Sequence, residues 1–479
     1  MSKDHLVVLG AGPGGYTAAF YAADLGYKVT LVDANDKPGG VCLHRGCIPS
    51  KALLHVAGLL RESRQAKEWG VCFDDPTIDL ELLRGWKEGI VGKMSGGLVT
   101  LCKQRGVSFI NQRGAFENSN TLKLAGGNSI NFDRCVLATG SQPAIPDNFR
   151  NAGSLVMDST TALNLPEIPE RLLIVGGGYI GLEMGSVYSA LGSRVTVVEM
   201  TDGLLPGVDR DLVRPLQALL KNEFESIRLT TKVLSVAERD QSGFVTMETA
   251  GERSEETFDR ILVSVGRRPN TSGLGLENTK VELDDKGFVK VDLKRQTSDP
   301  TILAIGDVAG EPMLAHKASH EARVAVDYLS GKNASFADRV IPAVVFTDPE
   351  IAWCGLTESE ARSNNVDVYK AVQDEIQFKF LIEKVEELKL ITDRKELEKE
   401  FSSTYKNTHK WKKTFKFPWD STGESVSHNI MFRFDIGDQI EINCTKYKKS
   451  LKIENNWSDS LQITIHTKEI MDWFSNPIN

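Results

Sequence analysis

The sequence predicts an α/β protein with two units of the Rossmann type, because the same succession of features occurs twice. Each unit begins with a short apolar run, typical of a buried parallel strand, that leads directly into a glycine-rich turn. The turns are Gly10–Gly15 and Gly176–Gly181, and a helix-like stretch follows each. An acidic residue, Asp33 or Glu199, stands 23 residues after the first glycine of its turn. Strand, turn, helix and acid in this order predict a βαβ unit.

The composition is that of an ordinary globular protein. The chain length of 479 residues predicts about three domains. Of the 479 residues, 41% are apolar and 25% are charged. A net charge of −8 without a basic patch argues against nucleic acid as a partner. No apolar run approaches the roughly 20 residues of a membrane span, and Met1–His5 shows no signal-peptide pattern. Seven scattered cysteines suit a reducing compartment, so we expect a cytoplasmic protein. We expect neither a membrane partner nor a metal.

The first unit has its strand, glycine turn, helix and acidic residue in the order of a dinucleotide-binding βαβ unit. Its glycines permit a tight turn and a close approach of the backbone to a pyrophosphate, and Asp33 can accept hydrogen bonds from a ribose. The turn therefore predicts a dinucleotide site. We expect Leu6–Leu9 and Tyr27–Asp33 as strands and Tyr16–Leu25 as the helix between them.

A pair of cysteines follows this unit, in the stretch Gly39–Lys51. Cys42 and Cys47 stand five positions apart at the start of an expected helix that has Pro49 in its first turn. The free N–H groups and the positive end of a helix dipole stabilise a thiolate beside them. Such a pair can cycle between dithiol and disulfide. The alternatives are two buried structural cysteines or half of a metal site.

The start of the chain followed by GGVCLHRGCIPSKAL closely resembles the FAD-dependent pyridine nucleotide–disulfide oxidoreductases, and among them the dihydrolipoamide dehydrogenase branch. The resemblance implies that Cys42 and Cys47 form the redox disulfide, with Cys42 exchanging with substrate and Cys47 facing the flavin as the charge-transfer thiol. It places Lys51 near the flavin N5 and Glu183 near the nicotinamide and flavin rings. A solvated first-turn lysine and an exposed helix carboxylate are the alternatives for these two residues.

The same resemblance implies FAD and NAD(H) as cofactors and assigns residues to each. Glu199 also favours NAD(H) by its charge, since a carboxylate there would repel the 2′-phosphate of NADP(H). The FAD residues are Gly10, Gly12, Gly15, Asp33, Lys51, Gly114, Thr139, Gly140, Ser141, Asp307 and Ala315. The NAD residues are Gly176, Gly178, Tyr179, Ile180, Gly181, Glu199, Val233 and Gly266.

The order of these motifs predicts an NAD domain inserted into an FAD domain. The motifs continue to about residue 365, and the start of an interface domain is the last part that resembles the family. The expected segments are FAD-binding 1–145, NAD-binding 146–270, FAD-binding 271–339, the start of the interface domain 340–369, and an unassigned α+β tail 370–479.

The tail differs in composition from the rest of the chain. It holds only Gly423 and Gly437 of the 41 glycines, and past about Tyr369 no resemblance to the family is visible. Periodicity predicts one or two amphipathic helices over Asp374–Phe401. Antiparallel strands are expected over His428–Phe434, Gln439–Cys444, Ser450–Ile453 and Leu461–His466.

The tail also lacks the family's histidine, which sits in a His-Pro-Thr segment, has a Glu five residues later and acts as general base from the partner subunit. His409, His428 and His466 do not fit this pattern, so no base is assigned. His44, between the cysteines, is expected at the surface or beside the site.

The leading hypothesis is an enzyme that passes electrons from a lipoamide dithiol, free or within 2-oxo acid dehydrogenase complexes, through the disulfide and FAD to NAD⁺. Two alternatives remain: a diaphorase-like FAD and NADH protein whose tail is a binding or regulatory module, and an inactive fusion. The family forms homodimers, which the altered tail puts in doubt for this chain.

Overall fold

In the computed structural model the chain divides into two compact units. The first comprises residues 1–206 and 215–355, and the second comprises residues 207–214 and 356–479. The structure describes residues 4–240, 242–337 and 341–365, together with five later strands at 410–417, 426–434, 439–444, 449–454 and 464–465.

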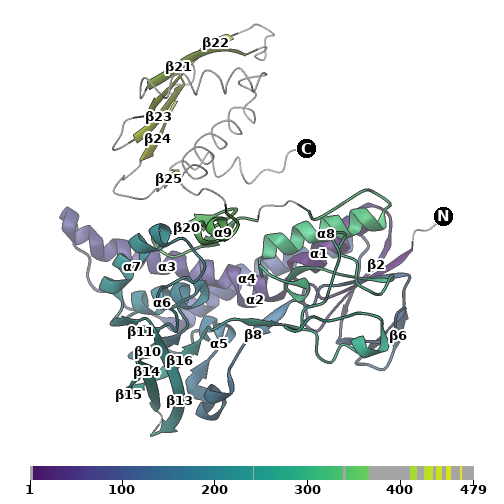
Figure 1. The fold of residues 1–479 in the computed structure, drawn as a ribbon, viewed down its shortest axis with the longest axis horizontal. Helices are drawn as coiled ribbons and strands as arrows, with labels where there is room; N and C mark the ends of the chain where they lie inside the picture. The colour runs from purple at the N-terminus through teal and green to yellow at the C-terminus, as the bar shows by residue number, and fades with distance from the viewer. Residues whose placement is uncertain are drawn as a thin grey trace. The chain divides into compact units, whose positions relative to one another are not determined.

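A five-stranded parallel sheet forms the centre of one half of the first unit, with the order β18-β7-β1-β2-β3. Its strands are apolar because helices and a small sheet cover both faces. Helices α1 and α8 contact each other beside this sheet (Figure 1). The elements are β1 (His5–Leu9), β2 (Lys28–Asp33), β3 (Ser108–Asn111), β7 (Arg134–Leu137), β18 (Ile302–Ala304), α1 (Pro13–Asp24) and α8 (Ala315–Leu329).

The predicted insertion is confirmed by strand β18. It pairs in parallel with β7, in the register Ile302↔Cys135, although the chain between them forms a second sheet. That sheet is also five-stranded, with the order β12-β11-β10-β16-β9. Its elements are β9 (Val156–Met157), α5 (Ser159–Leu163), β10 (Arg171–Val175), α6 (Tyr179–Leu191), β11 (Arg194–Val198), α7 (Arg210–Glu223), β12 (Ser226–Arg228) and β16 (Arg260–Val263).

Three smaller sheets complete the first unit, and one more strand pair joins its two halves. The antiparallel sheet β13-β14-β15, which the sequence analysis did not anticipate, packs its buried residues against the second parallel sheet. Strands β8 and β17 pair where the chain leaves and re-enters the first half. The bounds are β4 (Gly114–Asn118), β5 (Thr121–Leu124), β6 (Ser129–Asn131), β8 (Ser141–Pro143), β13 (Thr231–Arg239), β14 (Ser242–Thr249), β15 (Glu252–Phe258), β17 (Arg267–Pro269), β19 (Ala343–Val345) and β20 (Ile351–Trp353).

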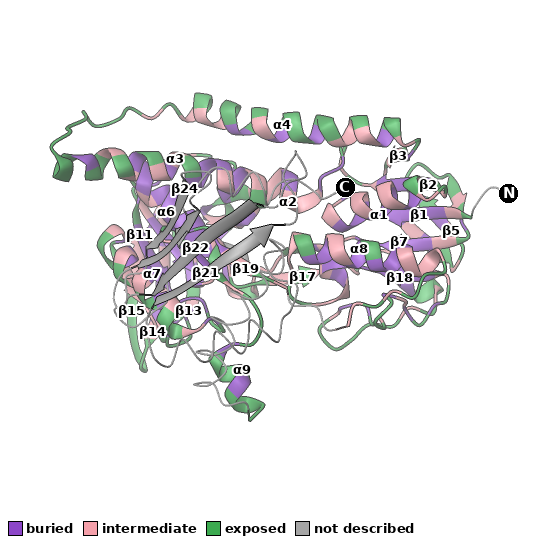
Figure 2. Ribbon diagram, turned by 90° about the horizontal axis from the view of Figure 1, so that it is seen from above, coloured by how far each residue is buried: buried purple, intermediate pink, exposed green. Residues whose placement is uncertain are grey.

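Helices α2 and α3 contain the two cysteines, and α4 is a long helix of the first unit. In Figure 2, α4 alternates between buried and exposed residues along its length. Every helix that the structure describes is too short or too polar to cross a lipid bilayer. The remaining elements are α2 (Gly40–Arg45), α3 (Cys47–Gln65), α4 (Leu80–Gln104) and the 3₁₀ turns η1 (Ala66–Trp69), η2 (Asp147–Leu155), η3 (Leu276–Asn278) and η4 (Gly306–Ala309).

The described part of the second unit comprises residues 207–214, where α7 begins, one short helix and an antiparallel sheet. Helix α9 (Glu358–Ser363) begins with a capping box between Thr357 and Glu360. The sheet has the order β21-β22-β23-β24-β25, which confirms antiparallel strands in the tail and adds β21 to those predicted. The helices expected over Asp374–Phe401 lie outside the described residues. The strands are β21 (Lys410–Phe417), β22 (Val426–Phe434), β23 (Gln439–Cys444), β24 (Lys449–Glu454) and β25 (Thr464–Ile465).

Candidate redox and nucleotide-binding site

The first glycine turn lies between β1 and α1 and requires glycine at two positions. Gly10 has φ +104°, and a Cβ there would lie 2.3 Å from the carbonyl oxygen of Ala138. A Cβ on Gly15 would lie 1.8 Å from the Gly10 carbonyl oxygen, so only glycine lets the helix approach the strand. Gly12 caps α1 without a capping side chain among the described residues. The first amides of α1 are therefore free for an anion.

The second glycine turn, between β10 and α6, repeats this construction. Gly176 has φ +107°, and a Cβ there would lie 2.6 Å from the Ser264 carbonyl oxygen. At Gly178, the N-cap of α6, a Cβ would meet no described atom within 4 Å, so the approach to the helix end is open. Tyr179 and Ile180 begin the helix, and Gly181 packs against the turn as Gly15 does. Both turns thus fit the pyrophosphate of a dinucleotide.

The two acidic residues hold their turns in the same way. The Ala11 amide donates to Asp33 Oδ2 over 2.6 Å, and the Gly177 amide donates to Glu199 Oε2 over 2.7 Å. Each second oxygen accepts from a residue two positions later, Asn35 or Thr201. Both carboxylates therefore fix the second residue of a glycine turn. Each accepts three hydrogen bonds and keeps about one lone-pair site for a ribose.

The cysteine pair spans two consecutive helices rather than one. Cys42 lies on α2 and Cys47 is the first residue of α3. Gly46 separates the two helices, because its backbone is not helical (φ −154°, ψ −115°). Pro49 occupies the first turn of α3, as predicted. Both cysteines are free thiols in this structure, and the Cys42 thiol donates a hydrogen bond to the Cys47 sulfur.

The pKa values of the two thiols are shifted in opposite directions. The hydrogen bond from Cys42, supported by the charge of Lys51, lowers the pKa of Cys47 to about 7 against the effect of burial. The same hydrogen bond, together with burial, raises the pKa of Cys42 above its ordinary value. Near neutral pH, about half of Cys47 is therefore thiolate, whereas Cys42 keeps its proton.

Lys51 and Glu183 form a partly buried ion pair next to the thiols. The Lys51 ammonium lies 3.0 Å from Glu183 Oε2, and the Glu183 side chain is only 6% exposed. The Phe346 amide donates to Glu183 Oε1 over 3.0 Å, and its ring lies under the ammonium, 4.1 Å from Nζ to the ring centre. The buried Glu183 is not an exposed helix carboxylate, and Lys51, although one third exposed, is paired with it.

Asp307 and Ser141 meet at the connection between the two halves of the first unit. The Ser141 hydroxyl donates to Asp307 Oδ2, and Arg267 Nε donates to the Ser141 hydroxyl over 2.7 Å. Thr139 Oγ1 donates to the carbonyl of Asn270, and the Asn270 amide donates to the carbonyl of Gly140. Four of the assigned residues are thus brought together by the β8–β17 crossing.

The other assigned residues differ in what they can offer. Gly114 begins β4, Ala315 begins α8, and Gly266 follows β16 with φ +133° and no described neighbour for a Cβ. The Val233 side chain is buried in the core below the second sheet, and its carbonyl already accepts from Asn148. Only its remaining backbone groups could touch a nucleotide.

Three residues near the site were not found from the sequence. The charges of both cysteines add to burial in raising the pKa of Tyr16, so this hydroxyl lies close to the pair. Burial and then Asp348 raise the pKa of Glu350, while Lys51 opposes them. Phe346 and Glu350 come from the loop between β19 and β20, far from Lys51 in sequence. Tyr16 alone had a signal, since it directly follows the first glycine turn.

None of the described histidine side chains stands among the groups that set the acidity of the two thiols. His44 Nε2 lies 3.1 Å from the carbonyl oxygen of Pro38, and His316 Nε2 lies 2.7 Å from that of Pro342. His409 and His466 lie outside the described residues, and for His428 the structure describes only its place in β22.

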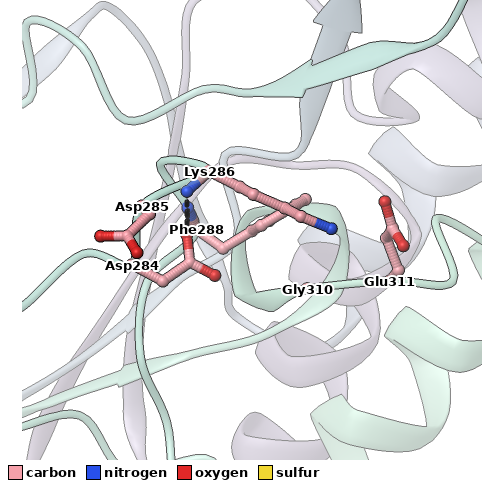
Figure 3. Close-up of a pocket in the computed structure, with 6 residues that line it drawn as sticks. All are labelled: Asp284, Asp285, Lys286, Phe288, Gly310 and Glu311. Atoms are coloured by element: carbon pink, nitrogen blue, oxygen red, sulfur yellow. Dashed lines mark hydrogen bonds between the residues drawn. The ribbon is translucent and has the colours of Figure 1, made fainter.

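An open cavity of about 360 Å³ lies away from these residues, and Figure 3 shows its lining. The Lys286 side chain extends towards Glu311, and Asp284 accepts hydrogen bonds from the amides of Lys286 and Phe288. Neither cysteine, glycine turn nor Asp307 contributes to the cavity, so it is no part of the redox site. It is lined by Asp284, Asp285, Lys286, Phe288, Gly310 and Glu311.

Comparison with known proteins agrees with this geometry. A model of the pyridine nucleotide-disulphide oxidoreductases matches residues 4–322, and the model of their dimerisation domain matches residues 341–398. The second match corrects the boundary drawn at Tyr369, since the similarity continues 29 residues further. The tail's changed composition had concealed it.

Individual relatives cover most of the chain. The dihydrolipoyl dehydrogenase of Vibrio parahaemolyticus is 44% identical over 76% of this chain and 77% of its own, and that of Haemophilus influenzae is 43% identical over 76% and 77%. Among solved structures, LpdA of Mycobacterium tuberculosis aligns with a TM-score of 0.69 at 30% identity, over 76% of this chain and 81% of its own. The Cu(II) complex of the HOCl-induced flavoprotein disulfide reductase RclA from Escherichia coli aligns with a TM-score of 0.66 at 28% identity, over 75% and 79%. This chain belongs to the pyridine nucleotide-disulphide oxidoreductases, enzymes that use FAD and NAD(H).

Proposed function

We propose that this chain exchanges an electron pair between a lipoamide-type dithiol and NAD(H), with Cys42 and Cys47 as its redox disulfide. The observation that carries the proposal is the hydrogen-bonded thiol pair with opposite acidities beside the Lys51–Glu183 ion pair. Overall, dihydrolipoamide and NAD⁺ become lipoamide, NADH and a proton. Bound FAD supplies the two-electron step between the thiols and the nicotinamide.

Each residue of the pair has a distinct task. In the oxidised pair, a substrate thiolate attacks Cys42 and forms a mixed disulfide, which releases Cys47 as a thiolate. The second substrate thiol then displaces Cys42, whose sulfur takes up a proton because its pKa is high. Cys47 leaves as a thiolate beside the Lys51 ammonium, whose charge lowers the pKa of this thiol. Lys51 stabilises this negative charge, and Glu183 together with Phe346 keeps the ammonium in place.

The two glycine turns take different cofactors in this proposal. The turn at Gly10 and the Asp307–Ser141 pair belong to the half that carries the cysteines, which suits FAD. The turn at Gly176 belongs to the inserted half, where the buried Glu199 suits the free 2′-hydroxyl of NAD(H). Glu183, on α6 behind that turn, pairs with Lys51 and so joins the two sites.

We also infer that the chain forms a homodimer, and helix α4 offers a surface for it. Gly85, Gly89, Gly92 and Gly96 lie on one exposed face, and none has a described neighbour within 4 Å of a Cβ. Each exposed glycine inside a helix costs roughly 1 kcal/mol relative to alanine. A second copy of α4 could use this face for close packing, and the match to a dimerisation domain supports such a partner. As a protein partner we infer a complex that carries lipoyl groups.

The decisive experiment reduces the purified full-length chain anaerobically with dihydrolipoamide and, separately, with NADH. A broad long-wavelength absorption band with both reductants, and reduction of NAD⁺ by the dithiol, is the expected result. Cys47→Ser should abolish the band while NADH still bleaches the flavin, and Cys72→Ser, at an exposed cysteine elsewhere, should leave it unchanged. A band with NADH alone would refute the dithiol half of the proposal and favour the diaphorase-like alternative.

A further inference from the structure

Three charged side chains are buried together behind the turn η4, outside the redox site. Their side chains are 0% exposed for Glu321, 3% for Lys317 and 10% for Arg295. Glu321 and Lys317 lie one helical turn apart on α8, and Arg295 comes from the loop that precedes β18. Buried charges are costly unless they are paired and hydrogen-bonded, so their contacts decide what the group can do.

Glu321 and Lys317 of α8 hydrogen-bond to the backbone at both ends of the turn η4. The Gly306 amide donates to Glu321 Oε2 over 2.6 Å. Lys317 Nζ donates to the carbonyl oxygens of Gly306 over 3.3 Å and of Gly310 over 2.8 Å. The third partner of this ammonium is Glu321 Oε1, at 3.3 Å. All three protons of the lysine and both oxygens of the glutamate are therefore used, and most of their bonds go to the backbone of one turn.

Arg295 supports the same carboxylate from the other side. Its Nη1 donates to Glu321 Oε1 over 2.9 Å, and its guanidinium stacks on Phe336, 4.7 Å from the ring centre. The residue has φ +68°, a region that favours glycine over any residue with a side chain. An arginine at this position is more strained than a glycine would be, so its guanidinium contributes something that glycine could not.

The turn η4, which these hydrogen bonds fix, contains Asp307. This residue follows Gly306 directly, and its carboxylate accepts from Ser141, which in turn accepts from Arg267. Gly306 has φ +74°, and a Cβ there would lie 3.1 Å from Cβ of Ala318 on α8. The turn is thus pressed against the helix that bears the charged pair. Its position, and with it that of the Asp307 carboxylate, is set from behind by Glu321 and Lys317.

We propose that Glu321, with Lys317 and Arg295, is a positioning residue that presets Asp307 for the polyol of the flavin cofactor. This inference rests on the proposed function, which places FAD at Asp307. A fixed backbone turn lets the carboxylate meet its ligand without further ordering, and this raises affinity. The competing explanation is that the three charges only stabilise the fold.

The first test measures FAD affinity of the full-length apoprotein by quenching of flavin fluorescence. Glu321→Gln should raise the Kd for FAD at least tenfold, because the anion that holds Gly306 and both cations is lost. Lys87→Met is the matched control: it removes another buried lysine, which donates to the Leu163 carbonyl, and its Kd should stay within about twofold of the original. An unchanged Kd for Glu321→Gln would overturn the inference.

A second test separates positioning from stability. Asp307→Ala, Glu321→Gln and the double variant form a cycle. If Glu321 acts through Asp307, the glutamine substitution has little further effect on the Kd once Asp307 is gone. Independent, additive effects would refute the proposed route.

A third variant guards against a loss of folding. Replacing all three charges by apolar residues (Arg295→Met, Lys317→Met and Glu321→Leu) removes the hold on the turn without leaving an unpaired charge, and such replacements are often well tolerated. The variant should still unfold cooperatively, at a lower Tm because the Gly306 amide loses its acceptor, and its FAD Kd should be at least tenfold higher. An unchanged Kd in the folded variant would show that the group is structural only. If the original chain bound no flavin, the proposed function itself would fail, which is a different outcome.

Discussion

Removing the hydrogen bond between the two thiols should make Cys47 a much weaker acid. That bond from Cys42 is the largest cause of its lowered pKa, ahead of the charge of Lys51. In Cys42→Ala, the pKa of Cys47 should therefore rise from about 7 towards the ordinary thiol value of about 8.5. The thiolate fraction at pH 7 would fall from about one half to about 3%.

The assay is the pH profile of alkylation by iodoacetamide, in a background where the exposed Cys72 and Cys354 are serine. Its midpoint is the better measure, since a thiolate of higher pKa is also more nucleophilic and partly offsets the lost fraction. Cys42→Ser is the matched control: its hydroxyl still donates, so its midpoint should stay near pH 7. Equal midpoints for the alanine and serine variants would show that the hydrogen bond does not set this acidity.

Three further predictions concern the same chain. Lys51→Met should also raise the alkylation midpoint of Cys47, but less than Cys42→Ala does; a larger rise would contradict the order of the two causes. Gly176→Ala should weaken NAD(H) binding at least tenfold in calorimetry while FAD content is kept, because its Cβ would lie 2.6 Å from a carbonyl oxygen; retained affinity would count against a nucleotide at this turn. Glu199→Ala leaves buried donors unpaired and should lower stability by about 1–3 kcal/mol in denaturant unfolding, whereas an unchanged midpoint would refute this role.

Much of the fold was predictable because its signals are local. The strand, turn and helix at Gly10 and again at Gly176 need glycine for contacts within one βαβ unit, so the residues themselves mark the turn. The return of the chain to the first sheet was also expected, because Asp307 is assigned to FAD and follows the inserted NAD segment in the sequence. The antiparallel sheet β13-β14-β15 was missed, although its strands are consecutive in the chain and β14 alternates between buried and partly buried residues.

The sequence by itself determined the candidates for the chemistry: two cysteines at the start of a helix, two glycine turns and their acids. It could not show which thiol is the acid, because that depends on a hydrogen bond across the break at Gly46. Nor could it bring Phe346 to Glu183, or Glu321 to the turn of Asp307. These contacts join segments from separate elements of the fold, and the free energy of a buried charge depends on its neighbours in space. Only the tertiary structure decided them.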